Sequence, residues 1–139
     1  MMFQSDLNWW AVLVAALAAY ILGALWYSPL LFGKTWLHLM GWSREQMEHH
    51  KKEALRGYLI NFVATFVVAA VLAHVVYFLN VVDWQEGLET GFWMWLGFVV
   101  TVQLGGVLWE GKKFALFLLN TGYNLASLLA MGVILAVWQ

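Results

Sequence analysis

The chain has 139 residues, of which 63% are apolar and only 11% charged, whereas about 25% of residues are charged in ordinary soluble proteins. A soluble domain of this length could not bury that much apolar surface, so the composition predicts a single membrane domain over residues 1–139. The formal net charge is −1, so we expect the lipid bilayer and no nucleic acid as a partner. The absence of cysteine excludes disulfides, thiolate metal sites and cysteine nucleophiles.

Four apolar segments are long enough to cross a bilayer as helices. They cover residues 7–27, 58–79, 91–109 and 114–138, and none contains Asp, Glu, Lys or Arg. We expect the first to be a retained span and not a signal peptide, because no basic residue precedes it. The fold predicted is an all-α integral membrane protein built as a bundle of four transmembrane helices.

The basic residues lie on alternate connections between these segments. All seven are in the first and third connections: Lys34, Arg44, Lys51, Lys52, Arg56, Lys112 and Lys113. The second connection is acidic, with Asp83, Glu86 and Glu89. Because positively charged connections stay in the cytoplasm, the pattern predicts that both termini of this multi-pass protein lie outside the cytoplasm.

The first connection contains a helix signal. Ser43 and Gln46 have the spacing of a capping box, and no glycine or proline follows before Gly57. We therefore predict a short cytoplasmic helix over about residues 44–56, and no residue type at its end prevents it from continuing into the second span.

Polar residues inside the spans are the main candidates for a functional site. The set is Asn61, Thr65, Gln103, Asn120, Asn124 and Ser127. In the fourth span Asn120, Asn124, Ser127 and Met131 fall on a stripe about 60° wide. The stripe could line a path for a solute, or it could pack dry against Gln103 and hold the helices together by hydrogen bonds.

His74 is the only histidine within a span. One interpretation is a cofactor or proton site, and the other is a neutral histidine that bonds a neighbouring helix or reaches the outer interface. An axial pair on haem would need a second subunit. We expect no cofactor and no metal site, including at the exposed cluster of Glu45, Glu48, His49 and His50.

Small residues recur every four positions in three of the spans. The ladders are Ala15, Ala19, Gly23; Gly97, Thr101, Gly105; and Gly122, Ala126, Ala130. Such ladders let two helices approach closely, which favours a homo-oligomer, most simply a two-fold dimer. The ladder at Gly122 is the first choice for the subunit interface, because it lies opposite Asn120 on the helix.

A motif follows the first span. Gly23, Trp26, Tyr27, Ser28, Pro29, Phe32, Gly33, Lys34 and Trp36 form the pattern GALWYSP followed by FGK and Trp. This pattern resembles the bacterial membrane-protein family known as domain of unknown function 1761, and the resemblance extends over nearly the whole chain. It implies a compact four-helix protein in a bacterial cell membrane and no activity.

Two functions remain open from the sequence. The first is a non-enzymatic membrane protein that acts as a homo-oligomer or accessory subunit, since the spans hold no acid and base arranged for catalysis. The alternative is a small-solute transporter or channel lined by the polar residues of the second, third and fourth spans. The direction in which the stripe around Asn124 points distinguishes the two.

Overall fold

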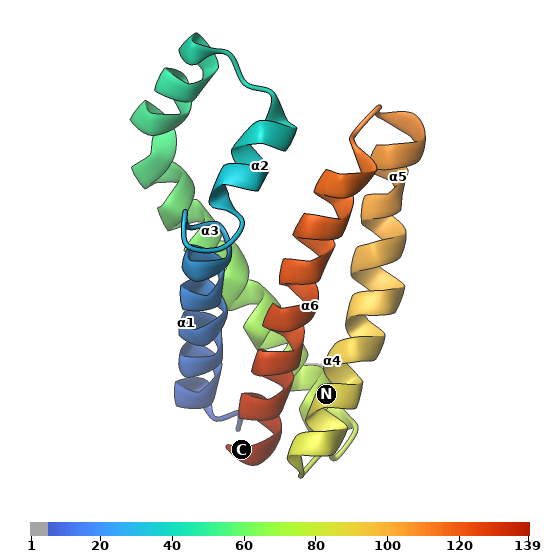
Figure 1. The fold of residues 1–139 in the computed structure, drawn as a ribbon. Coiled ribbons are helices and arrows are strands. Elements are labelled where there is room, and N and C mark those ends of the chain that lie inside the picture. The colour runs from blue at the N-terminus through green and yellow to red at the C-terminus, as the bar shows by residue number, and fades with distance from the viewer. Residues whose placement is uncertain (1–5) are drawn as a thin grey trace.

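The computed structural model describes residues 6–139, which are helical with no strand in that range (Figure 1). Residues 1–5 of the predicted domain lie outside the described residues. In chain order the elements are α1 (Trp9–Trp26), α2 (Gly33–Met40), α3 (Arg44–Phe78), α4 (Trp84–Trp95), the π-helical stretch η1 (Leu96–Val100), α5 (Thr101–Trp109) and α6 (Phe114–Val137). Four helices are long and apolar enough to cross a membrane: α1, α3, α6 and the continuous helix formed by α4, η1 and α5.

Local side-chain caps explain where three of the helices begin. Asn8 accepts hydrogen bonds from two backbone N–H groups at the start of α1, and Asp83 accepts one from the backbone of Glu86 at the start of α4. At α3 both bonds of the Ser43 and Gln46 capping box are formed. The predicted helix over residues 44–56 is therefore confirmed as helix, although not as a separate element.

The helix α3 runs for 35 residues without interruption, about 52 Å at 1.5 Å per residue. It continues past Gly57 because nothing there breaks it: glycine is tolerated inside a helix, and Gly57 has no neighbouring atom in its way. The structure also adds α2, which the sequence analysis did not predict. This helix has eight residues and no side-chain cap at its start, so it lacks the signals on which a prediction depends.

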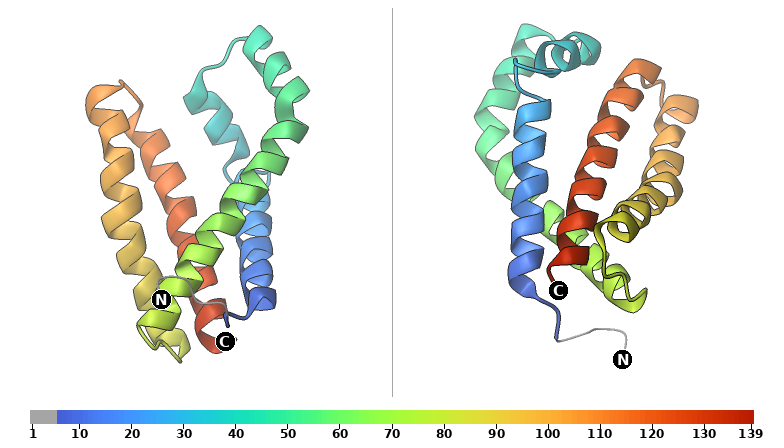
Figure 2. Two further views of the ribbon diagram at one scale, coloured as in Figure 1. Left: turned by 180° about the vertical axis from the view of Figure 1, so that it is seen from behind. Right: turned by 60° about the horizontal axis from the view of Figure 1, so that its bottom comes forward.

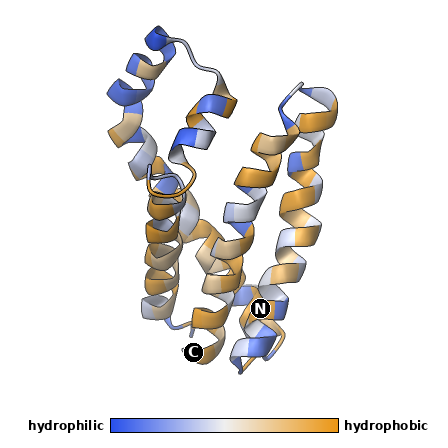
Figure 3. Cartoon of the chain, in the orientation of Figure 1, coloured by the Kyte–Doolittle hydropathy of each residue, from blue (hydrophilic) through white to orange (hydrophobic). Residues whose placement is uncertain are grey.

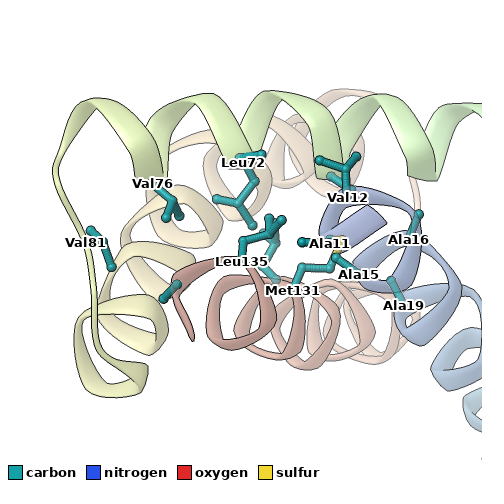
Figure 4. Close-up of a cluster of buried hydrophobic side chains, with 14 residues drawn as sticks. Ala11, Val12, Ala15, Ala16, Ala19, Leu72, Val76, Val81, Met131 and Leu135 are labelled. Atoms are coloured by element: carbon teal, nitrogen blue, oxygen red, sulfur yellow. The ribbon is translucent and has the colours of Figure 1, made fainter. Parts of the chain in front are cut away.

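The helix α6 occupies the centre of the fold and packs against α1, α3 and α4 (Figures 1 and 2). Buried side chains of α1, α3 and α6 form the hydrophobic core (Figure 4), which includes Val12, Val76 and Met131, all less than 2% exposed. At α4 the backbones themselves meet: a Cβ added to Gly87 would lie 2.5 Å from the carbonyl oxygen of Gly132. The start of α1 and the C-terminal end of α6 also lie at this end of the molecule.

At the other end the helices diverge. The helix α2 and the first half of α3 stand apart from α5 and the start of α6, which gives the ribbon the shape of a V (Figure 2, left). Hydrophilic residues concentrate at this end on α2, on α3 and in the turn between α5 and α6 (Figure 3). Because these three segments hold all seven basic residues, we refer to it as the basic end.

Candidate functional site

The polar stripe of α6 lines two cavities, although its Ser127 and Met131 side chains are buried. The larger cavity, about 430 Å³, is lined by Asn120, and the smaller, about 210 Å³, by Asn124, Ser127 and Met131. One face of a single helix therefore lines both cavities in turn, from the basic end towards the middle of the bundle.

The larger cavity lies between α5 and α6 at the basic end. Gln103 and Asn120 supply its amides, and Glu110 and Lys112 stand at its outer rim. The Lys112 ammonium is 3.3 Å from the Glu110 carboxylate, and both side chains are more than 60% exposed. The two charges thus neutralise each other, while Val102, Leu116 and Phe117 add apolar lining.

The smaller cavity lies between α3, η1 and α6. It brings together Asn61 and Thr65 of α3 with Asn124 and Ser127 of α6, and Val99 of η1 closes one side. The Thr65 hydroxyl donates to the backbone carbonyl of Asn61 at 2.8 Å, so its hydrogen is used within the helix. Four of the six polar residues predicted from the sequence therefore share one cavity, and the other two share the larger cavity.

Three amides in these cavities have no hydrogen-bond partner among the described residues. They are the side chains of Asn61, Gln103 and Asn124, which line the cavities; Asn61 is exposed and the other two are half-buried. An unpaired amide is costly in an apolar medium, so these groups require water, a solute or another chain. Neither cavity is lined by a charged residue other than Glu110 and Lys112.

The fourth amide, Asn120, is held by the motif that follows α1. The Tyr27 hydroxyl donates to Asn120 Oδ1 at 2.7 Å, and the Trp26 indole donates to the Leu119 carbonyl at 3.2 Å. Since its oxygen is occupied, Asn120 can offer its NH₂ group to the larger cavity. Tyr123 completes this contact, because its hydroxyl donates to the Ala19 carbonyl at 3.0 Å and its ring lies 5.5 Å from that of Tyr27.

The rest of the motif forms the tight turn that positions Trp26 and Tyr27. The backbone N–H of Phe32 donates to Trp26 and that of Gly33 to Ser28, both at 2.9 Å. Gly33 is required here, because a Cβ would lie 2.5 Å from the Tyr27 carbonyl oxygen. The remaining residues surround this turn: Gly23 lies against the Tyr123 ring, Phe32 packs on Trp26, Trp36 packs on Tyr27, and Pro29 and Lys34 are exposed.

His74 does not line either cavity. Its Nδ1 lies 2.7 Å from the Ala70 carbonyl of its own helix, and its ring meets Trp9 edge to face. Residues 6–139 contain no group of three or more His, Asp or Glu side chains that could hold a metal ion.

The glycines of the small-residue ladders differ in what lies opposite them. Gly122 faces the Trp26 ring at 3.3 Å, so the ladder first chosen for a subunit interface packs within the chain at this position. Gly97 and Gly105 instead face open space. The closest helix contact uses Gly87, Gly91 and Gly132, which the sequence analysis did not select, although Gly87 and Gly91 have the spacing of a ladder.

Comparison with known proteins adds a family and nothing more specific. A family model described as "Protein of unknown function (DUF1761)" matches residues 10–136. The chain belongs to this family. The match confirms the resemblance carried by the motif around Tyr27 and includes both cavities. No curated protein and no solved structure matches the chain, so a function for this DUF1761 protein has to be argued from the cavities.

Proposed function

We propose that this DUF1761 protein crosses a bacterial cell membrane four times and conducts a small, uncharged solute along the polar face of α6. The observation that carries the proposal is that this face, from Asn120 to Ser127, lines two successive cavities. A stripe whose role was to hold helices together would be consumed in hydrogen bonds between them. Asn61, Gln103 and Asn124 make none with the described residues.

The energetics of the bilayer support a hydrated path. Lipid tails offer no hydrogen bonds, so an amide facing them pays a desolvation cost that water or a solute in the cavity removes. Three such amides on three different helices face the two cavities. A sequence that needed only packing would place Leu, Ala or Gly there.

The lining also restricts the solute. No charged side chain lines the smaller cavity, so an ion would cross that region without a counter-charge. Amides and hydroxyls suit a neutral molecule with hydrogen-bonding groups. The smaller cavity, about 210 Å³, is below the usual range of about 300–1,000 Å³ for small-molecule sites, and the larger, about 430 Å³, is in its lower half. The narrower part of the path therefore favours a solute of a few heavy atoms.

The charge distribution sets the proposed orientation. All seven basic residues lie at the basic end, so we place this end in the cytoplasm and both termini outside. Single cysteines at Glu48 and Gln85, treated with an impermeant thiol reagent on intact cells, test this placement. Labelling of position 85 alone is expected, and labelling of position 48 alone would reverse the orientation.

Solute permeability of proteoliposomes tests the function. Vesicles containing the wild type should swell faster in glycerol or urea than empty vesicles, and Asn124→Leu should remove most of that increase. Thr35→Leu is the control, because Thr35 is exposed and lines neither cavity. No increase for the wild type with either probe, or equal permeability of the Asn124→Leu variant, would contradict a solute path.

A second candidate is the non-enzymatic homo-oligomer or accessory subunit. The ladder of Gly97, Thr101 and Gly105 favours it, since a Cβ at either glycine would meet no atom of the chain, as expected for a helix face that receives a partner. The mass of the wild type in nanodiscs, compared with that of Gly97→Leu, tests this interface. A dimer that dissociates in the variant supports it, and a monomeric wild type excludes it.

A further inference from the structure

The basic end has more basic than acidic side chains. Lys112 forms an ion pair with Glu110. The five basic residues between α1 and the apolar part of α3 are all exposed and form no ion pair within residues 6–139: Lys34, Arg44, Lys51, Lys52 and Arg56. The same stretch holds three glutamates, Glu45, Glu48 and Glu53, so an excess of two positive charges is available to a partner of opposite sign.

Two exposed leucines indicate where this surface lies relative to the bilayer. The helix α1 has 18 residues, about 27 Å, which is slightly less than the hydrocarbon thickness of about 30 Å. If α1 starts at the opposite face of the hydrocarbon layer, the turn that follows it comes close to the boundary between acyl chains and headgroups. Leu30 and Leu31 in this turn are 85% and 54% exposed, and acyl chains are the medium that would cover them.

The helix α2 and the first half of α3 form a helical hairpin. Basic side chains lie next to this boundary on both of its helices. Lys34 lies at the start of α2, which has no acidic residue. Lys52 and Arg56 are four positions apart on α3, hence on one face, immediately before its apolar part. The hairpin is held together by rings, because His50 of α3 lies 6.1 Å from Trp36 and 4.8 Å from Trp42.

We infer that the turn at Leu30, the helix α2 and the adjoining part of α3 form a docking surface for anionic phospholipids of the leaflet at the basic end. Leu30 and Leu31 enter the acyl boundary, and Lys34, Lys52 and Arg56 contact the phosphates. Charge complementarity selects anionic over zwitterionic lipids, at about fivefold in affinity for each basic residue near the surface. This surface is independent of the cavities along α6.

Native mass spectrometry of the full chain, released from micelles containing equal phosphatidylglycerol and phosphatidylcholine, tests this inference. The wild type should retain phosphatidylglycerol preferentially. The triple variant Lys34→Gln, Lys52→Gln, Arg56→Gln should lose that preference by up to about a hundredfold, whereas Lys34→Arg, Lys52→Arg, Arg56→Lys should keep it. Because all three side chains are exposed, thermal unfolding is expected to stay unchanged in both variants.

Three results would overturn the proposal. The first is equal retention of the two lipids by the wild type, and the second is undiminished phosphatidylglycerol retention by the glutamine variant. The third is displacement of phosphatidylglycerol by millimolar inorganic phosphate, which would assign the charge to a soluble anion. If the glutamine variant does not fold, the salt dependence of the wild type tests the inference instead. The preference of the wild type for phosphatidylglycerol should fall with added salt, and a preference that does not depend on salt would contradict the inference.

Discussion

The two ends of this molecule use the same central helix in opposite ways. Near the termini, α6 presents Gly132, and the backbone of α4 comes into direct contact with it at Gly87. Towards the basic end, α6 presents Asn124 and Asn120, and the neighbouring helices stand back to leave two cavities. The choice of side chains along α6 thus differs between the part of the fold that is tightly packed and the part that holds the two cavities.

The closed end should be the part most sensitive to added volume. In Gly132→Ala the new methyl group would collide with the Gly87 carbonyl oxygen, and overpacking of this kind costs about 1–3 kcal/mol of unfolding free energy. Reversible unfolding in mixed micelles, followed by circular dichroism, measures the loss.

The control for this prediction is Gly105→Ala, where a Cβ meets no atom of the chain. We expect no loss of stability there, and a gain of up to about 1 kcal/mol, because alanine has the higher helix propensity. If both variants unfold alike, the difference in packing between the two ends is wrong.

The open end should depend on local caps more than on packing. Replacing Ser43 with Ala removes the hydroxyl that accepts from the Gln46 backbone N–H, at a cost of about 0.5–2 kcal/mol to the start of α3. Hydrogen exchange of residues 44–50 should accelerate by about two- to thirtyfold, while exchange in α6 stays the same. Thr35→Ala, an exposed position in α2 that caps no helix, should leave residues 44–50 protected.

The smallest expected effect concerns the contact that joins the motif to the stripe. Tyr27→Phe removes the hydrogen bond to Asn120, and such bonds between membrane helices average about 0.6 kcal/mol. The variant should therefore fold and lose only a few tenths to one kcal/mol in the same unfolding assay. Tyr58→Phe, at an exposed position on α3, is the control, and a loss equal to that of Tyr27→Phe would show that the contact contributes nothing specific.

The sequence predicted what depends on helical periodicity and on local signals. Its charge-free segments correspond to helices long and apolar enough to span a membrane, the capping box at Ser43 begins α3, and the polar stripe of α6 follows from residue spacing alone. The helix α4 starts at Trp84, seven residues before the predicted span of 91–109, because Asp83 caps it there. The sequence pattern assigned these residues to a loop, because the segment is acidic.

What the sequence could not predict depends on which helices meet. Gly87, Gly91 and Gly132 differ from Gly97 and Gly105 only in having a helix opposite them, and no pattern within one helix contains that information. The pairing of Tyr27 with Asn120 joins residues 93 positions apart. The sequence places Tyr27 in the motif and Asn120 in the polar stripe, and only the fold shows that the two side chains meet.

The central claim is that the stripe of α6 faces water inside the membrane domain, and cysteine accessibility tests it most directly. The chain has no cysteine of its own, so Asn124→Cys can be compared cleanly with Val63→Cys, an exposed apolar position on α3 that lines neither cavity. A small, uncharged, water-soluble maleimide should modify position 124 in proteoliposomes and leave position 63 unmodified, because a thiol reacts as the thiolate, which forms only in contact with water. Equal resistance of both positions would mean that the stripe is dry, and the account of a solute path would be wrong.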